Sequence, residues 1–212
     1  MSDRMALRIG IDFDNTIVCY DEVFVRLAKA DGLIPGDLQG GKAEVRDFLR
    51  RLGGGEEKWQ RLQGRVYGDQ MDSGLLFEGV SRFLARCRWR PDIRVFIVSH
   101  KTEFGHFDER GVNLRDVARA WMVRHRFFDK DGFALPNDAL YFESTLDDKI
   151  ERIAQLSCTH FIDDLAEVLE DSRFPPATKR ILFLNGRFGR PTADYDVCAD
   201  WRGIEQAVFA NA

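Results

Sequence analysis

Residues 7–16 read LRIGIDFDNT and join a short apolar run to a pair of aspartates. Apolar runs of this length are typical of strands that are buried on both faces of a parallel sheet. Side chains alternate along a strand, so Asp12 and Asp14 are expected to point to the same side. Two such carboxylates repel each other, and a bound divalent cation such as Mg²⁺ would remove the repulsion. A plainer interpretation is a strand end with solvated aspartates and Asn15 in a turn.

Further apolar runs alternate with amphipathic segments along the rest of the chain. Two of these segments, residues 112–128 and 145–156, place apolar side chains on one helix face. Alternating strands and helices predict right-handed crossovers and an α/β fold with a doubly wound, Rossmann-like parallel sheet. The further runs are Ile93 to Val98, Ala139 to Phe142, Thr159 to Ile162 and Arg180 to Leu184.

The first crossover is much longer than the others and has a helical pattern with glycine-rich breaks. It is too long for a simple connection and too regular for a loop. We therefore predict a small helical cap at residues 20–75, inserted into an α/β core domain of residues 1–19 and 76–212. Residues 76–87 would form the helix that returns the chain to the sheet. The expected cap helices span residues 21–30, 43–52 and 56–66.

Composition and charge are those of an ordinary globular protein. The 212 residues include 44% hydrophobic and 31% charged residues, with 31 Lys and Arg against 35 Asp and Glu. This balance predicts no nucleic-acid partner. No apolar run is long enough to cross a bilayer and no signal-peptide pattern starts the chain, so we expect no membrane partner and a cytoplasmic location. The scattered cysteines predict free thiols: Cys19, Cys87, Cys158 and Cys198.

Polar residues follow the predicted strands at one edge of the sheet. Ser99 directly follows the second strand, and Asp163 and Asp164 follow the fourth. In an open parallel sheet, ligands bind at the carboxyl ends of the strands. Together with Asp12 and Asp14, these residues predict a functional site at that edge.

Lys149 is expected near the same edge, in the first turn of the helix after the third strand. If Thr145 caps this helix, a lysine there opposes the helix dipole unless it meets an anion. Surface pairing with Glu143 or Glu151 is the alternative interpretation. Lys101 also lies near a strand end and competes for the same role, but it does not start a helix.

These residues, in this order, resemble the four motifs of the haloacid dehalogenase-like hydrolase superfamily. The resemblance rests on DFDNT at residues 12–16, Ser99, Lys149 and the pair Asp163-Asp164, and it covers nearly the whole chain. The helical insertion resembles the family's cap between motifs one and two. Asn15 departs from the pattern, since many members have glycine there.

The resemblance implies a phosphatase that forms an aspartyl-phosphate on Asp12, with Asp14 as general acid and base. Family dehalogenases lack the second aspartate, so Asp14 indicates phosphate esters. The implied cofactor is Mg²⁺, held by Asp12, Asp14, Asp164 and Asp163; which member of the last pair binds directly is open, and Asp164 is favoured. The implied substrate contacts are Thr16, Ser99, His100 and Lys149, although a lone histidine in a loop, such as His100, is more often a local hydrogen-bonding residue.

The expected substrate is a small phosphomonoester metabolite, because a cap over the site would admit small molecules. Two other functions stay open. A phosphomutase or phosphotransferase would pass the phosphoryl group to a sugar, and a regulatory protein could use the same fold without catalysis. The sequence indicates neither the substrate nor the oligomeric state.

Overall fold

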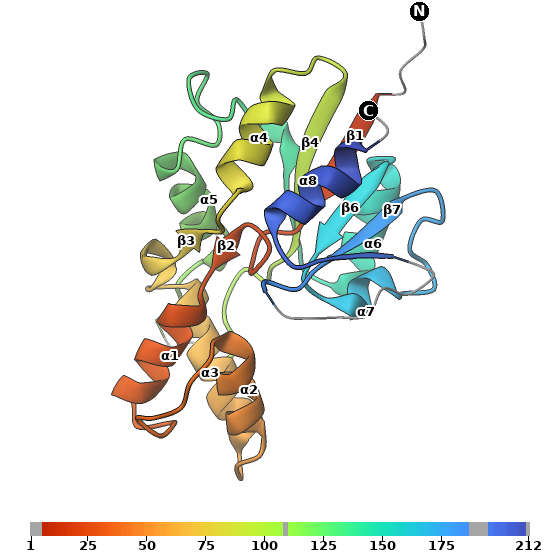
Figure 1. The fold of residues 1–212 in the computed structure, drawn as a ribbon. Coiled ribbons are helices and arrows are strands. Elements are labelled where there is room, and N and C mark those ends of the chain that lie inside the picture. The colour runs from red at the N-terminus through yellow and green to blue at the C-terminus, as the bar shows by residue number, and fades with distance from the viewer. Residues whose placement is uncertain (1–5, 108–109, 187–194, 211–212) are drawn as a thin grey trace, which may run out of the picture. The chain divides into compact units, whose positions relative to one another are not determined.

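The computed structural model describes residues 6–107, 110–186 and 195–210. Its main feature is a six-stranded parallel sheet with the order β5-β4-β1-β6-β7-β8 (Figure 1). The predicted α/β class and parallel sheet are therefore confirmed. The strands are β1 (Leu7–Ile11), β4 (Ile93–His100), β5 (Leu140–Glu143), β6 (His160–Asp163), β7 (Lys179–Phe183) and β8 (Asp196–Cys198).

Strand β1 lies in the middle of this sheet, between β4 and β6. Ile9 is in register with Val95 on one side and with His160 on the other. From β1 the chain adds β4 and β5 outward, then returns to the opposite side of β1 and adds β6, β7 and β8. This reversal is the topological switch point at which open α/β sheets bind their ligands. Asp12 follows β1 directly and so lies at that point.

The middle of the sheet is built from apolar side chains and one glycine. Ile9 and Ile11 are fully buried, as expected for a strand covered on both faces. A Cβ atom on Gly10 would lie only 2.5 Å from Cδ2 of Phe161, its register partner on β6. The packing of the buried Phe161 ring over this position therefore favours glycine at position 10.

Helices flank the sheet and help to place the loop after β1. The C-terminal helix α8 starts at Trp201. The centroid of its ring lies 5.2 Å from that of Phe83 on α4. The Nε1 atom of Trp201 donates a 3.1 Å hydrogen bond to the carbonyl of Thr16. The last helix therefore holds the segment that carries Asp12 and Asp14. These helices are α4 (Val80–Arg88), α6 (Leu146–Gln155), α7 (Ala166–Leu169) and α8 (Trp201–Phe209).

Contacts divide the chain into two compact units. One contains residues 1–18, 76–101 and 125–212, and the other contains residues 19–75 and 102–124. The second unit has its own core, in which Phe24 stacks on Trp59 with the ring centroids 5.0 Å apart. Its helices are α1 (Asp21–Ala30), α2 (Lys42–Arg50), α3 (Gly55–Tyr67), the 3₁₀ turn η1 (Met71–Ser73) and α5 (Leu114–Arg124).

This division groups residues 102–124 with the helical segment, whereas the sequence analysis placed them in the core domain. In that unit, Trp121 on α5 donates a 3.1 Å hydrogen bond to the carbonyl of Gly74. The short strands β2 (Val18–Cys19) and β3 (Leu75–Leu76) pair with each other where the chain passes between the two groups of segments. The domain boundaries of the sequence analysis stay a prediction.

Three local expectations were wrong. The helix expected from residue 76 begins at Val80, because Leu75–Leu76 form β3 and Gly79, at φ 94°, precedes the first helical residue. Helix α5 ends at Arg124, so residues 125–128 do not extend it as expected. The 3₁₀ turn η2 (Asn137–Ala139) takes Ala139 out of the predicted strand. Gly79 precedes the first of these helices, and Arg126, at φ 61°, follows the end of α5. Apolar periodicity alone does not reveal such backbone conformations.

No helix in the part of the chain that the structure covers is long and apolar enough for a membrane crossing. All four cysteines lie within the described residues, and each is a free thiol, as predicted.

Candidate active site

The loop after β1 turns sharply and holds Asp12 and Thr16 together. Asn15 adopts a left-handed backbone conformation, with φ 64°, and its N–H donates to the carbonyl of Val18 at 2.8 Å. Glycine and asparagine tolerate this conformation best, which explains why asparagine can stand where family members often have glycine. The hydroxyl of buried Thr16 lies 3.4 Å from Oδ2 of Asp12.

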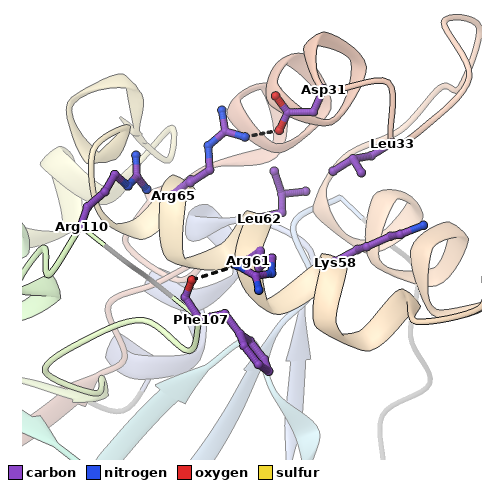
Figure 2. A pocket seen from close by; sticks show the side chains of 8 residues that line it. All are labelled: Asp31, Leu33, Lys58, Arg61, Leu62, Arg65, Phe107 and Arg110. Atoms are coloured by element: carbon purple, nitrogen blue, oxygen red, sulfur yellow. Dashed lines mark hydrogen bonds and ion pairs between the residues drawn. The ribbon is translucent and has the colours of Figure 1, made fainter.

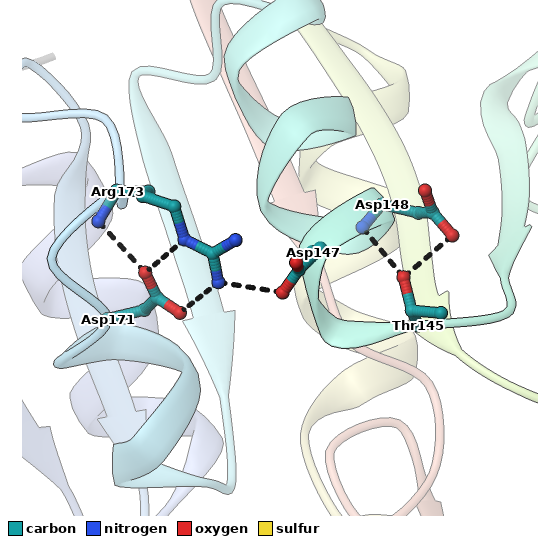
Figure 3. Close-up of polar contacts among 5 residues, drawn as sticks. All are labelled: Thr145, Asp147, Asp148, Asp171 and Arg173. Carbon is teal, nitrogen blue, oxygen red and sulfur yellow. Dashed lines mark hydrogen bonds and ion pairs between the residues drawn. The ribbon is translucent and has the colours of Figure 1, made fainter.

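Helix α6 begins beside this loop with a side-chain cap. The Oγ1 atom of Thr145 accepts a 3.1 Å hydrogen bond from the N–H of Asp148 and donates to its carboxylate at 2.7 Å (Figure 3). Thr145 is therefore the N-cap that the sequence predicted. Capping of this kind fixes the first turn of a helix and thus the direction of the residue that follows, Lys149.

An arginine from a later segment also holds the first turn of α6. Arg173 donates hydrogen bonds of 2.7 Å to Asp147 and to Asp171 (Figure 3). The same arginine lowers the pKa of Asp147 and, through its side-chain hydrogen bonds, lowers that of Asp171 to about 2. Both carboxylates are thus ionised at neutral pH and join residues 171–173 to the start of α6.

Lys149 lies inside the protein between two carboxylates. Its Nζ atom is 2.7 Å from Oδ1 of Asp12 and 2.6 Å from Oδ2 of Asp163. Lys149 is only 1% exposed, and the two aspartates are also buried. The alternative of surface pairing with Glu143 or Glu151 is not what the structure shows. Buried ions require such partners, since each alone would carry a large desolvation cost.

Three carboxylates at this edge have the spacing of a cation site. Asp12, Asp163 and Asp164 each offer one oxygen atom, and these atoms all lie within 4.8 Å of one another. Hard oxygen donors of this kind suit Mg²⁺, which is usually bound by one or two carboxylates together with water or phosphate. The residues present therefore fit the implied metal.

Burial and charge together shift the pKa values of this cluster. Desolvation raises the pKa of Asp12 to about 6; Lys149 opposes the rise, while Asp163 adds to it. Desolvation also raises the pKa of Asp163, and Lys149 again opposes the rise. Burial would lower the pKa of Lys149, but Asp12 and Asp163 outweigh burial and raise it. The cluster holds more negative than positive charge, and a divalent cation would balance it.

Lys101 makes a contact that sequence reasoning missed. Its Nζ atom lies 2.7 Å from Oδ2 of Asp14, and Lys101 is 3% exposed. Its own N–H donates to the carbonyl of Glu143, which fixes the chain just beyond β4. The sequence makes Lys101 a competitor for the role of Lys149, whereas in the structure Lys101 pairs with Asp14 and Lys149 pairs with two other aspartates. The available signal was its position two residues after Ser99.

The two remaining predicted residues follow one another at the end of β4. Ser99 is buried and pairs in register with Phe142 of β5. His100 is exposed, and its Nε2 atom lies 3.1 Å from the carbonyl oxygen of Ser144. A hydrogen bond of this kind is the interpretation that the sequence favours for His100.

The fold is that of the haloacid dehalogenase-like hydrolases, so the resemblance read from the sequence is confirmed at the level of the fold. Several solved structures with this architecture match the chain along nearly its whole length. No protein-family model and no curated protein gives a significant match to the sequence.

Three of these structures show the range of proteins on this fold. A haloacid dehalogenase-like hydrolase from Streptococcus pneumoniae matches with a TM-score of 0.60 and 15% identity, covering 98% of this chain and 99% of that one. A hydrolase of the same family from Deinococcus radiodurans, solved with bound phosphate and sodium, has a TM-score of 0.59, 12% identity and coverage of 97% and 96%. Protein tyrosine kinase A of Mycobacterium tuberculosis has a TM-score of 0.62, 16% identity and coverage of 97% and 99%.

Proposed function

We propose that this protein is a magnesium-dependent phosphatase that hydrolyses a small phosphomonoester through an aspartyl-phosphate on Asp12. The observation that carries the proposal is the buried arrangement of Lys149 between Asp12 and Asp163, beside Asp164. A purely structural sheet edge has no need for two buried carboxylates and a buried lysine with a third carboxylate beside them.

Asp12 and Asp164 would hold the metal, with Asp163 mainly holding Lys149. Both oxygens of Asp163 already accept hydrogen bonds: Oδ2 from Lys149 and Oδ1 from the N–H of Leu165, at 2.9 Å. Of the pair, Asp164 is proposed as the direct ligand, because its carboxylate lies within 4.8 Å of those of Asp12 and Asp163 and Asp163 is the one that holds Lys149. When bound, Mg²⁺ would supply positive charge that reduces the repulsion between a carboxylate and a phosphate.

The protein groups would act in a fixed order. The carboxylate of Asp12 attacks phosphorus, and the phosphoryl group becomes attached to its oxygen as the leaving alkoxide departs. Lys149 and Ser99 would hold phosphoryl oxygens where negative charge spreads in the transition state. Water then attacks the phosphorus of the intermediate, which releases phosphate and restores Asp12.

Asp14 is suited to proton transfer in both steps. It would give a proton to the leaving oxygen and later take one from the attacking water. The contact with Lys101 fixes the orientation of the Asp14 carboxylate. Lys101 is therefore proposed as a positioning residue for the acid and base.

The substrate class follows from the chemistry of the cluster together with the structural neighbours. The Deinococcus radiodurans hydrolase binds phosphate, and a phosphoserine phosphohydrolase-like protein from Francisella tularensis also matches this chain. Small phosphorylated metabolites are thus the first candidates. The Mycobacterium tuberculosis kinase shows that the fold alone does not set the activity, so transfer to an acceptor has to be measured too.

The test is release of inorganic phosphate from a panel of phosphorylated metabolites, with Mg²⁺ and with chelator. We expect turnover that needs the metal and disappears in Asp12→Asn. Product analysis with an added sugar acceptor distinguishes hydrolysis from transfer. Folded, metal-loaded protein that neither releases nor transfers phosphate from any compound would contradict the proposal.

A further inference from the structure

The second unit contains a hollow whose chemistry differs from that of the aspartate cluster. It has a volume of about 360 Å³, within the range of pockets that bind small molecules. Every described residue that lines it belongs to residues 19–75 or 102–124, which form one unit. Among its lining residues there is no member of the proposed catalytic set.

Positive charge dominates the wall of this hollow (Figure 2). Lys58, Arg61 and Arg65 follow one another on α3 at spacings of three and four residues and so share one face of that helix. Arg110 adds a fourth cation from the loop before α5, and among the described residues of the lining Asp31 is the single acidic one. Like charges on one helix face destabilise the helix, and an anion between them would remove that cost.

Three of the four cations have a carboxylate partner that holds them in place. These ion pairs leave the wall ordered and still cationic, because only one of the three partners belongs to the lining. Arginine donates through five N–H groups, so an ion pair with one carboxylate does not exhaust it. The pairs are Arg61 with Glu57, Arg65 with Asp31, and Arg110 with Asp69.

Lys58 differs from the three arginines. Within the described part of the chain, the structure gives its ammonium group no hydrogen bond or ion pair, and the residue is exposed. Figure 2 shows its side chain extended away from Arg65 and Arg110, at one end of the group of lining residues. Lys58 is thus the cation whose charge a ligand would balance.

The rest of the wall is apolar and includes an unusual aromatic residue. Leu33, Leu62 and Phe107 line the hollow, and Phe107 is half exposed. Its backbone has φ 60°, a left-handed conformation that bulky residues rarely adopt and that is found preferentially at ligand sites. The guanidinium of Arg61 lies 5.1 Å from its ring centre and donates to its carbonyl at 3.3 Å. This pair offers a flat surface on which a planar group can stack.

We propose that this hollow binds a small organic anion in which a flat apolar group carries a phosphate, phosphonate or carboxylate. The flat group would pack against Phe107 and Leu62, and the oxyanion would bind to the ammonium group of Lys58. The site shares no residue with the aspartate cluster, so it does not depend on the proposed phosphatase activity. Such a ligand could be part of the substrate or a separate regulatory metabolite, and both have the same chemistry.

Phenylphosphonate is a suitable probe, because its carbon–phosphorus bond is not a phosphate ester. Isothermal titration would be run on the full chain with chelator present, at low ionic strength, so that no catalytic metal assists binding. We expect saturable binding that weakens with salt and becomes about five- to tenfold weaker in Lys58→Gln, which removes one charge contact. Methylphosphonate should bind more weakly than phenylphosphonate.

Arg46→Gln is the matched control. It removes one positive charge from the same unit, on α2, and Arg46 does not line the hollow. Phe107→Ala tests the apolar part separately and should weaken phenylphosphonate more than methylphosphonate. The proposal is overturned if no saturable binding occurs, if Lys58→Gln binds as the wild type does, or if Arg46→Gln loses as much affinity.

A kinetic arm distinguishes the two sources of the ligand. With p-nitrophenyl phosphate and Mg²⁺, phenylphosphonate inhibition that becomes weaker in Lys58→Gln and competes with substrate would assign the hollow to substrate recognition. A change in rate without competition, again reduced in Lys58→Gln, would assign it to regulation. Because the titration needs no turnover, an inactive protein would leave the binding result intact.

Discussion

The ammonium nitrogen of Lys101 lies 2.7 Å from Oδ2 of Asp14, and both residues follow the ends of neighbouring strands. Strands β1 and β4 pair with Ile11 opposite Ile97. Asp14 is three residues beyond that pair and Lys101 is four residues beyond it. The register of two central strands thus brings the proposed acid and base against a buried lysine.

Lys101→Met should lower kcat strongly and have a smaller effect on the free energy of unfolding. The variant loses the contact that orients Asp14, and general acid and base catalysis contributes about 10²- to 10⁴-fold to such reactions. We expect kcat to fall by about tenfold or more, with a changed pH profile and partial rescue in Lys101→Arg. Lys130→Met, at an exposed position of the same unit, is the control and should leave both kcat and the pH profile unchanged. An unchanged pH profile in Lys101→Met would show that Lys101 does not position Asp14.

The pairing of Lys101 with Asp14 is not predicted by the sequence, whereas most of the sheet is. The five longer strands of the sheet were predicted within about two residues, because continuous apolar runs show buried strands clearly. Strand β8 has only three residues, Asp196–Cys198, and carries no such pattern. Which lysine meets which aspartate depends on strand register and on backbone turns after the strands, which apolar patterning does not encode.

The placement of Lys149 could be predicted only in part. Its position near the carboxyl ends of the strands followed from the helix start at Thr145, because an N-cap has a clear sequence signature. Its burial between Asp12 and Asp163 did not, since a lysine in a first turn is usually solvated. The grouping of residues 102–124 with the helical segment rests on contacts between distant segments, which leave no local pattern in the sequence.

Lys149→Met should destabilise the metal-free protein strongly. It leaves the buried carboxylates of Asp12 and Asp163 without their shared cation, and breaking a buried ion pair from one side costs about 3–5 kcal/mol. Urea unfolding with chelator measures the loss. Adding Mg²⁺ should restore part of it, because a ligand that binds only the folded state stabilises it. A variant as stable as the wild type under chelator would show that this pair is not the main support of the site.

Asp163→Asn and Asp164→Asn should have different effects. Asp164→Asn should weaken Mg²⁺ binding by about tenfold or more, as loss of a direct ligand does, with little change in metal-free stability. Asp163→Asn should instead lower metal-free stability, because Asp163 holds Lys149 and accepts from Leu165. Titration calorimetry with Mg²⁺ and urea unfolding with chelator separate the two. Equal losses of Mg²⁺ affinity would place both residues in the direct ligand set.

The stability of the metal-free protein should depend on pH through Asp12. Its pKa is about 6 in the folded chain against 3.8 for an ordinary aspartate, because burial disfavours the charged form. The folded state therefore holds this proton more tightly than the unfolded state. The contribution of Asp12 to the free energy of unfolding is thus largest below pH 4 and falls as the pH rises from about 4 to above 6.

Asp12→Asn isolates this effect, since asparagine resembles the protonated aspartate. With chelator present, the variant should gain stability relative to the wild type as the pH rises through this window, by an amount on the order of 3 kcal/mol. Urea unfolding of both proteins at several pH values between 4 and 7.5 measures the difference. Mg²⁺ should remove the gain, because the cation offsets the buried charge in the wild type alone. A difference that stays constant with pH in the metal-free proteins would mean that Asp12 keeps an ordinary pKa, and that Lys149 compensates fully for its burial.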